Sequence, residues 1–406
     1  MKVGLLKLLS RVIGNKHIRF DGSRIFYWNV PMIALPFDFL VNLEHDLSKR
    51  YGERVHSIFY QIGKLQGENG TNILLKKFNI TPKKEDLSFF AEQTEFVGIG
   101  KLSFYDLSTL PINAELKFSP NASVYNERFK KASAGVCNIS RGLITGAIKA
   151  LYNKTYVNND DLDGIEKECV AMGSDTCTFE IRRKEDWQKT EKADNSFGYD
   201  DDALNDIREK ENLTSLLRTP AKSQVDPNTE LGGMIKKKSQ GSLPFGFEGG
   251  VIRICDMPCL ITPMDIYSII YHELISQFGD DVKKRLYQNA KTLGKNLASH
   301  VDRGFNLSAQ REPLKYLVGM FGCLGLGKLD IVRVGKGKKT LHFSLNDGPG
   351  NHYRHLFGVA KMQTDEMIAG MVSGMLAYNQ GKEFMTQETD CVVAGTSSCS
   401  FKSEAI

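Results

Sequence analysis

The chain contains the same unit twice, and this duplication limits its possible folds more than any other feature. Identical residues recur 227 positions further along the sequence: Pro36 with Pro263, His45 with His272, Gly52 with Gly279, Tyr60 with Tyr287, and Gly67 with Gly294. The run Gly-Lys-Leu at 100–102 recurs at 327–329 with the same separation. An unbroken register of this kind predicts two copies of one structural unit.

Later identities keep their order, but their separation drifts. The matches are Leu116, Phe118, Ser119 and Asn121 with Leu341, Phe343, Ser344 and Asn346, Gly142-x3-Gly146 with Gly370-x3-Gly374, and Glu166, Cys169 and Cys177 with Glu388, Cys391 and Cys399. The drift predicts short loop insertions, chiefly at 158–163 in the first copy. We therefore expect one domain over 17–186 and a second over 247–406, packed as an internal pseudo-dimer.

Two segments lie outside the copies. Residues 1–16 have apolar residues at helical spacing, which predicts an amphipathic helix that packs on the second domain, with weak contact to a membrane surface as the alternative. Residues 187–246 are polar and include an acidic run and Lys236 to Lys238, which predicts a solvated linker. A basic docking patch at these lysines is the alternative interpretation.

Hydrophobic periodicity within each copy predicts an α+β fold, with helices on one side of a mostly antiparallel sheet. The expected order is an edge strand, a loop that holds Pro36 or Pro263, two helices, two paired strands, a further helix and a closing β-hairpin. The corresponding ranges are 23–29, 37–51, 54–65, 95–107, 115–119 and 136–152 in the first copy, and 251–254, 264–278, 282–293, 329–334, 340–345 and 365–378 in the second.

The composition excludes several classes of protein. Among 406 residues, 53 Lys and Arg face 48 Asp and Glu, a mild excess that argues against direct nucleic-acid binding. No apolar stretch is long enough to span a membrane, and no signal peptide precedes the eight cysteines. We therefore expect a cytoplasmic location, where spaced cysteines are more often metal ligands than disulfides.

A Glu-x2-Cys-x7-Cys pattern is the clearest candidate site. It occurs as Glu166, Cys169 and Cys177, and again as Glu388, Cys391 and Cys399. Two thiolates and a carboxylate suit a structural Zn²⁺ ion, whose fourth ligand the sequence does not name. The glutamate lies on the opposite face of a regular strand from the first cysteine, so a bulge or a strand end is needed to join them. Buried packing or a cross-strand disulfide are the alternatives.

Other candidates carry weaker signals. Cys137 is a possible fourth ligand, but a helix-packing role is preferred because the corresponding region near Asp365 has no cysteine. Cys255 and Cys259 are interpreted as core residues. His45 and His272 are weak ligand-binding candidates, with a packed or surface histidine as the favoured alternative. The paired glycines at 142–146 and 370–374 predict close helix packing.

No catalytic residues are predicted. The chain lacks a phosphate-binding loop, a Gly-x-Ser-x-Gly elbow and a His-Glu-x-x-His pair, so an enzyme is less favoured than a binding protein.

The hairpin sequences at 168–181 and 388–401 resemble the closing part of the 4-vinyl reductase domain, which belongs to a superfamily of ligand-binding domains in nitric oxide signalling and Golgi transport. The resemblance implies a small-molecule-binding α+β module, in which a glutamate and three cysteines hold zinc. Glu166, Cys169 and Cys177 match three of these ligands, as do the corresponding residues of the second copy. The remaining family cysteine falls near 141–145, where this chain has none.

We accordingly expect a sensor, carrier or adaptor that binds a small hydrophobic or aromatic molecule and holds structural zinc in each module. A reductase of a tetrapyrrole pathway, or its accessory protein, is one alternative. A structural scaffold similar to the trafficking subunits is the other.

Overall fold

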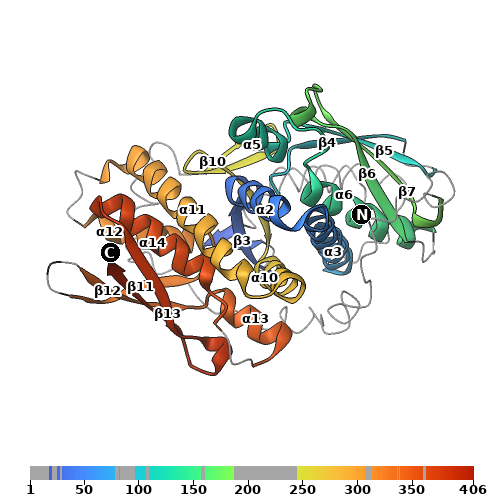
Figure 1. Cartoon of the computed structure of the whole chain (residues 1–406). Helices are drawn as coiled ribbons and strands as arrows, with labels where there is room; N and C mark the ends of the chain where they lie inside the picture. The colour runs from blue at the N-terminus through green and yellow to red at the C-terminus, as the bar shows by residue number, and fades with distance from the viewer. Residues whose placement is uncertain are drawn as a thin grey trace.

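Figure 1 shows the computed structural model of the chain, in which two lobes lie on either side of a shared centre. The structure describes residues 18–20, 25–27, 30–77, 82, 97–106, 109–156, 161–186, 245–307, 312–335, 337, 339–359 and 363–406. The N-terminal helix expected at 1–16 and most of the predicted linker lie outside these ranges.

The centre is a six-stranded antiparallel sheet to which both halves of the chain contribute, in the order β1-β2-β3-β10-β9-β8. Its strands are β1 (Ile18–Phe20), β2 (Ile25–Tyr27), β3 (Val30–Pro36), β8 (Phe245–Glu248), β9 (Val251–Ile254) and β10 (Met257–Pro263). Strands β3 and β10 pair so that Ala34 lies opposite Ile261, its counterpart 227 positions later. The residues on either side of this pair are therefore related by approximate two-fold symmetry.

The sequence interpretation of this region was wrong in two respects. Pro36 and Pro263 lie at the ends of β3 and β10, not in loops. Proline is tolerated there because it removes a ladder donor only at the strand end, while the apolar residues before Pro36 are buried as a strand requires. The predicted edge strands at 23–29 and 251–254 correspond to β2 and β9, and both lie inside the sheet, β2 between β1 and β3 and β9 between β8 and β10.

Apart from α12 (Pro313–Cys323), whose equivalent positions 86–96 lie outside the described residues, the two halves follow the same order of elements, and the predicted α+β class is confirmed. The first half contains α2 (Phe37–Tyr51), α3 (Arg54–Lys77), β4 (Lys101–Asp106), β5 (Ile112–Lys117), α5 (Pro120–Phe129), α6 (Asn138–Tyr156), β6 (Leu162–Glu168) and β7 (Cys177–Arg183). The second contains α10 (Asp265–Phe278), α11 (Asp281–Phe305), α12 (Pro313–Cys323), β11 (Lys328–Val334), β12 (Thr340–Asn346), α13 (Pro349–Phe357), α14 (Glu366–Gln380), β13 (Phe384–Asp390) and β14 (Cys399–Ala405). Each half has its own four-stranded sheet, ordered β4-β5-β7-β6 and β11-β12-β14-β13.

Strand pairing corrects one part of the repeat alignment. Leu116 lies opposite Leu102, and Leu345 lies opposite Leu329. Since Leu102 and Leu329 are equivalent, Leu116 corresponds to Leu345 and not to Leu341. Helices α5 and α13, which follow these strands, were not predicted.

Glycines allow two helix pairs to pack at very short distance, as predicted. A Cβ on Gly142 or Gly146 of α6 would come within 2.1 or 1.9 Å of a backbone oxygen of α3. A Cβ on Gly374 of α14 would likewise come within 2.0 Å of an α11 oxygen. Only glycine fits such contacts, so the backbones of α3 and α6, and of α11 and α14, define the helical layer of each lobe.

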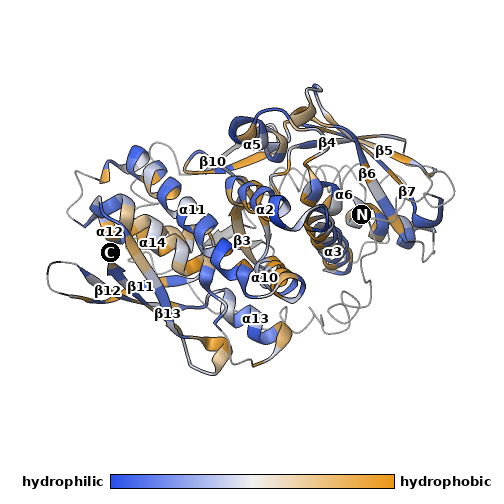
Figure 2. Cartoon of the chain, in the orientation of Figure 1, coloured by the Kyte–Doolittle hydropathy of each residue, from blue (hydrophilic) through white to orange (hydrophobic). Residues whose placement is uncertain are grey.

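Helix α11 shows how the core is patterned. Its hydrophilic and apolar residues alternate around the helix (Figure 2), and Val282, Leu286, Leu293 and Leu297 are buried at helical spacing. The helix packs closely on α14, and polar side chains on another of its faces, Arg285 and Asn289, bond to Asp46 of α2. None of the described helices is both long and apolar enough to cross a bilayer.

Contacts between the halves repeat the symmetry of the central sheet. Tyr51 stacks on Phe278, its counterpart, with ring centroids 4.3 Å apart. The Ala34 amide donates to the Leu324 carbonyl, and the equivalent Ile261 amide donates to the Val97 carbonyl. The two halves therefore share both a sheet and an aromatic contact at the approximate axis.

Candidate metal centre and adjoining cavities

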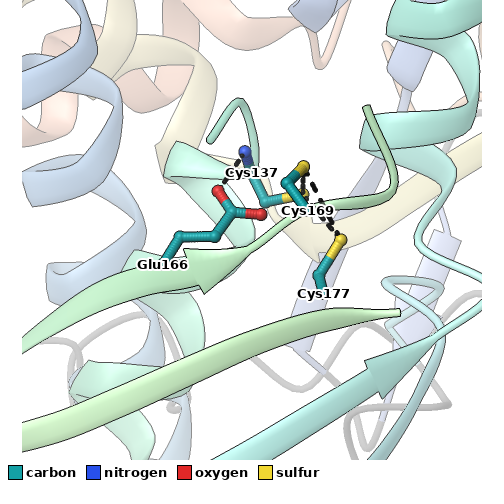
Figure 3. Close-up of side chains that lie close together, drawn as sticks. All are labelled: Cys137, Glu166, Cys169 and Cys177. Carbon is teal, nitrogen blue, oxygen red and sulfur yellow. Dashed lines mark hydrogen bonds between the residues drawn. The ribbon is translucent and has the colours of Figure 1, made fainter. Parts of the chain in front are cut away.

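Three thiols and one carboxylate meet at the end of the first four-stranded sheet (Figure 3). The Sγ atoms of Cys137, Cys169 and Cys177 lie 3.6 to 3.9 Å apart, and Glu166 completes the group. All three thiols are buried and free. A disulfide, one of the alternatives from the sequence, does not occur here.

The spacing of the sulfur atoms fits a tetrahedral zinc site. Zinc–thiolate bonds are about 2.3 Å long, so two thiolates of one tetrahedron are about 3.8 Å apart. The three observed separations, 3.6, 3.8 and 3.9 Å, lie around this value. The geometry therefore matches three thiolate ligands of one ion, with Glu166 as the fourth.

The local fold of the β6–β7 hairpin joins Glu166 to the cysteines. The pairing register shifts between Glu166 and Glu168, which is the irregularity that the sequence spacing required. A 3-10 turn over Val170–Met172 follows, and Gly173 ends it with φ of 104°. Glycine adopts this left-handed conformation without strain, so the chain returns at once and places Cys177 beside Cys169.

The second half builds a cluster of the same form but different chemistry. Glu388, Cys391 and Cys399 are joined by Asp365, and the four ligand atoms lie within 4.8 Å of one another. The hairpin again has a register shift after its glutamate, and Gly395 has φ of 105°. The first cluster thus offers three thiolates and one carboxylate, and the second offers two of each.

Matching backbone contacts support both clusters. The Cys137 amide donates to the Glu166 carboxylate at 3.0 Å, and the Asp365 amide donates to the Glu388 carboxylate at 3.3 Å. The amide after the first hairpin cysteine donates to the second thiol at 3.4 Å in each half. Such contacts fix the orientation of the candidate ligands.

The charges of the clusters indicate that they need a cation. Hydrogen bonds from Cys137 and Cys177 lower the pKa of the Cys169 thiol to about 2, while burial raises the pKa of Glu166 to about 8. In the second cluster, burial raises the pKa of Asp365 to about 7 and that of Glu388 to about 10. Four buried acids cannot all ionise side by side unless a positive charge compensates them.

Unpaired oxygen atoms lead to the same conclusion. One carboxylate oxygen of Glu166, one of Glu388 and both of Asp365 are buried without a hydrogen-bond partner. Buried acceptors are normally satisfied, and a bound metal ion would satisfy these. The residues present therefore fit a zinc ion in each half.

The six predicted ligands lie in two clusters, three in each half of the chain. The interpretation of Cys137 needs correction. A packing role was preferred for it, but its thiol lies within 3.9 Å of both other sulfurs. The signal was present in the sequence: Cys137 and Asp365 are 228 positions apart, the same separation as the two glycine pairs.

The glutamate of each cluster also forms part of a cavity wall. The first cavity, of about 320 Å³, is lined by Glu44, His56, Asn138, Arg141 and Glu166, among others. The second, of about 520 Å³, is lined by Lys283, Glu366, Ala369, Thr386 and Glu388, among others. Glu166 and Glu388 occupy equivalent positions, so each candidate metal centre adjoins an accessible cavity.

The two histidine candidates have different surroundings. His45 lines the first cavity and stacks on Phe129, with ring centroids 3.6 Å apart. His272 stacks on Phe357 at 3.9 Å and shares a hydrogen bond with the Tyr353 hydroxyl. Neither of the two cavities includes His272, whose contacts are those of a packed histidine.

The remaining cysteines lie in the core. Cys255, Cys259 and Cys323 are buried, and burial raises the pKa of the Cys323 thiol to about 12. They belong to neither metal-like cluster, in agreement with the packing role expected for Cys255 and Cys259.

Comparisons with known proteins found similar solved structures only. No family model and no curated protein matches the sequence. The phenol-responsive sensory domain of the transcription activator PoxR, with phenol, matches at 16% identity and TM-score 0.39, over 44% of this chain and 90% of that one. A trafficking protein particle complex subunit 3 from Naegleria fowleri, covalently bound to palmitic acid, matches at 11% identity and TM-score 0.29, over 35% and 95%.

A vinyl-4-reductase family protein from Methanocaldococcus jannaschii matches at 20% identity and TM-score 0.24, over 35% of this chain and 88% of that one. The three structures are of the kinds that the hairpin resemblance names.

Proposed function

We propose that this protein is a non-enzymatic small-molecule-binding protein, a sensor, carrier or adaptor, with a structural zinc ion in each half. The observation that carries the proposal is that the glutamate of each metal-like cluster is also a wall residue of a cavity. Zinc would hold this carboxylate in one position and so fix the shape of the cavity beside it.

Zinc in these clusters has a structural role in the proposal. All four candidate ligands of each cluster come from the protein, so no position is left for water or substrate. When bound, the ion supplies positive charge that compensates the buried thiolates and carboxylates. Cys137 and Asp365 tie the start of α6 or α14 to the closing hairpin, and this cross-link keeps the helical layer against the sheet.

The ligand in the proposal is a small molecule with an apolar or aromatic body. Val41, Tyr125 and Val136 supply apolar surface to the first cavity, while polar side chains line its remainder. This combination is typical of small-molecule sites, in which a few polar groups orient a mostly apolar ligand. The halves would act as an internal pseudo-dimer, because the β3–β10 pairing and the Tyr51–Phe278 contact join them symmetrically.

Native mass spectrometry of the full chain as isolated tests the proposal. We expect a mass increment for two zinc ions and, in part of the population, a further increment for a small organic molecule. Denaturing spectra should show neither. A metal-free protein whose eight thiols all titrate as free would contradict the zinc sites, and a zinc-loaded protein that binds none of a broad set of small molecules would contradict the binding function.

A further inference from the structure

Arg141 is a positively charged residue of the first cavity without an anionic partner. Its guanidinium carbon lies 4.3 Å from the ring centroid of Tyr60, and its Nε atom is buried without a hydrogen-bond partner. No carboxylate among the described residues forms an ion pair with it. Arg141 is half-buried, and an unpaired guanidinium that stacks on an aromatic ring at a cavity wall is a suitable partner for an anionic ligand.

Glu44, one of the acidic side chains of the cavity, already has two partners of its own. Glu44 accepts hydrogen bonds from His56 at 2.7 Å and from Asn138 at 2.6 Å. This pairing raises the pKa of His56 despite the opposing effect of burial, so the two residues form an ion pair of their own. Arg141 is therefore left as the positive charge available to a ligand.

Asn121 adds a second unpaired group to the same cavity. Its side-chain amide donates to the Val136 carbonyl, but its Oδ1 atom is buried without a partner. Asn121 is only 1% exposed, and a buried acceptor of this kind is normally satisfied. A ligand hydroxyl or N–H group would satisfy it.

We propose that the first cavity binds a small organic carboxylic acid that has an apolar body and a hydrogen-bond donor. The guanidinium of Arg141 would take the carboxylate in a two-point contact, and Asn121 would accept from the donor group. Glu53 and Glu166 also line the cavity and disfavour anions of higher charge such as phosphate. This assignment rests on the proposed function and names the ligand class of the first half.

The second cavity does not offer the same contact. Ala369 occupies the position of Arg141, so no guanidinium lines the second cavity. Its two cations are lysines: Lys283 pairs with Asp280 at 2.9 Å, and Lys284 is exposed to solvent. A lysine ammonium cannot take a carboxylate in the planar two-point contact that Arg141 offers. The two halves would therefore differ in ligand, and carboxylate binding belongs to the first.

Ligand-observed NMR on the zinc-loaded full chain tests the inference. The probes are a set of small aromatic and aliphatic carboxylic acids, 4-hydroxybenzoate among them, each beside its neutral amide, with inorganic phosphate as a further arm. We expect acids to bind in preference to their amides, and Arg141→Ala, which introduces the residue of the second half, to weaken the acids by about tenfold or more. Arg141→Lys, which retains the charge, should restore part of the affinity.

Arg333→Ala is the matched control, because it removes the same charge from an exposed site on β11 and should leave acid binding unchanged. Zinc content and thermal midpoint show whether each variant is folded. Equal binding of acids and amides, binding of phosphate in place of the acids, or an Arg141→Ala variant that is folded and binds acids as before would overturn the inference while the proposed function stands. If no probe of either kind binds, both fail.

Discussion

Asp365 is the residue at which the two candidate metal sites differ. It stands where the first half has Cys137, so the second site has two thiolates in place of three. Thiolates bind zinc more tightly than carboxylates do in sites of this kind, since the softer ligand suits this borderline-soft ion. The two sites should therefore hold zinc with unequal strength, although both are built on a hairpin with the same register shift.

Substituting Asp365 and Cys137 for one another's residue type makes the difference in zinc affinity measurable. Zinc release from the wild-type chain to a chelator should occur in two phases. Asp365→Cys should slow the fast phase by about tenfold or more, and Cys137→Asp should accelerate the slow phase by a similar factor, because each change adds or removes one preferred ligand. The measurement is the time course of zinc transfer to a colorimetric chelator.

Asp280→Cys is the control for this experiment. Its side chain is 83% exposed, so it adds a thiol outside either cluster and should leave both phases unchanged. A single release phase in the wild type, with neither exchange altering it, would refute the unequal-site prediction.

The contribution of His56 to the stability of the folded state depends on pH. The Glu44 carboxylate raises its pKa above 6.5 against the effect of burial. The stabilisation is therefore fully present below the unfolded-state pKa of 6.5 and is lost as the pH rises through the higher folded-state value. His56→Gln should lower the thermal midpoint more at about pH 5.5 than at about pH 8.5.

His300 provides the opposite case. Burial lowers its pKa, so the folded state disfavours its charged form and loses stability when the pH falls below 6.5. His300→Gln should relieve this loss at about pH 5.5. If both substitutions change the midpoint equally at the two pH values, the assigned pKa directions are wrong.

The candidate ligands could be found from the sequence only in part. Spacing and repetition identified Glu166, Cys169 and Cys177, and even required the bulge after Glu166. Cys137 was not chosen because its equivalent is an aspartate, and a search for repeated cysteines cannot detect a ligand that changes type. The counterpart of Arg141 is Ala369, so repetition gave no signal for the arginine.

At the level of elements, the α3–α6 contact positions the first site. Cys137 immediately precedes α6, and the glycines of this helix bring it against the backbone of α3. Any separation of the two helices would move both Cys137 and Arg141. Close helix packing is therefore a requirement of the site as well as of the core.

Gly146→Ala should accordingly be strongly destabilising. Its Cβ would lie 1.9 Å from the Lys64 carbonyl oxygen, so α6 would have to move, at a cost of about 1–3 kcal/mol or more for overpacking. Gly70→Ala in α3 is the matched control, because a Cβ there meets nothing within 4 Å. It should stabilise the chain by about 0.5–1 kcal/mol through helix propensity.

Denaturant midpoints measure both effects, and zinc retention reports whether the Cys137 cluster survives. If the two alanine variants behaved alike, the helix contact would not have the closeness assigned to it.

Secondary structure was predictable where periodicity was strong. The predicted ranges 37–51 and 264–278 match α2 and α10 to within one residue. Strands β3 and β10 were missed because prolines at both ends of an apolar run resemble a loop, and only the pairing of one half with the other makes them strands. A tertiary contact of this kind has no local signal.

For the whole molecule, the central sheet makes the two halves mutually dependent. Ala34 and Ile261 face each other across β3 and β10, and the neighbouring pairs repeat about this point. Around it, Arg50 pairs with Asp281 at 2.8 Å, and Arg285 pairs with Asp46 at 2.9 Å. Repetition in the sequence predicted two similar units, but not that a shared sheet would join them.

The shared sheet predicts that the covalent connection is dispensable for association. Coexpressed as separate chains, residues 1–186 and 245–406 should copurify in equal amounts and unfold in one transition, because separation would expose the edges of β3 and β10 and their apolar side chains. Analytical ultracentrifugation and thermal unfolding check this.

Ala34→Pro is the informative variant. It removes the amide that donates to the Leu324 carbonyl at 2.8 Å, at the centre of the contact between the halves. The variant should therefore reduce copurification of the two fragments. Fragments that remain separate, each with its own zinc and its own transition, would show instead that the halves are independent domains whose contact is incidental to their stability.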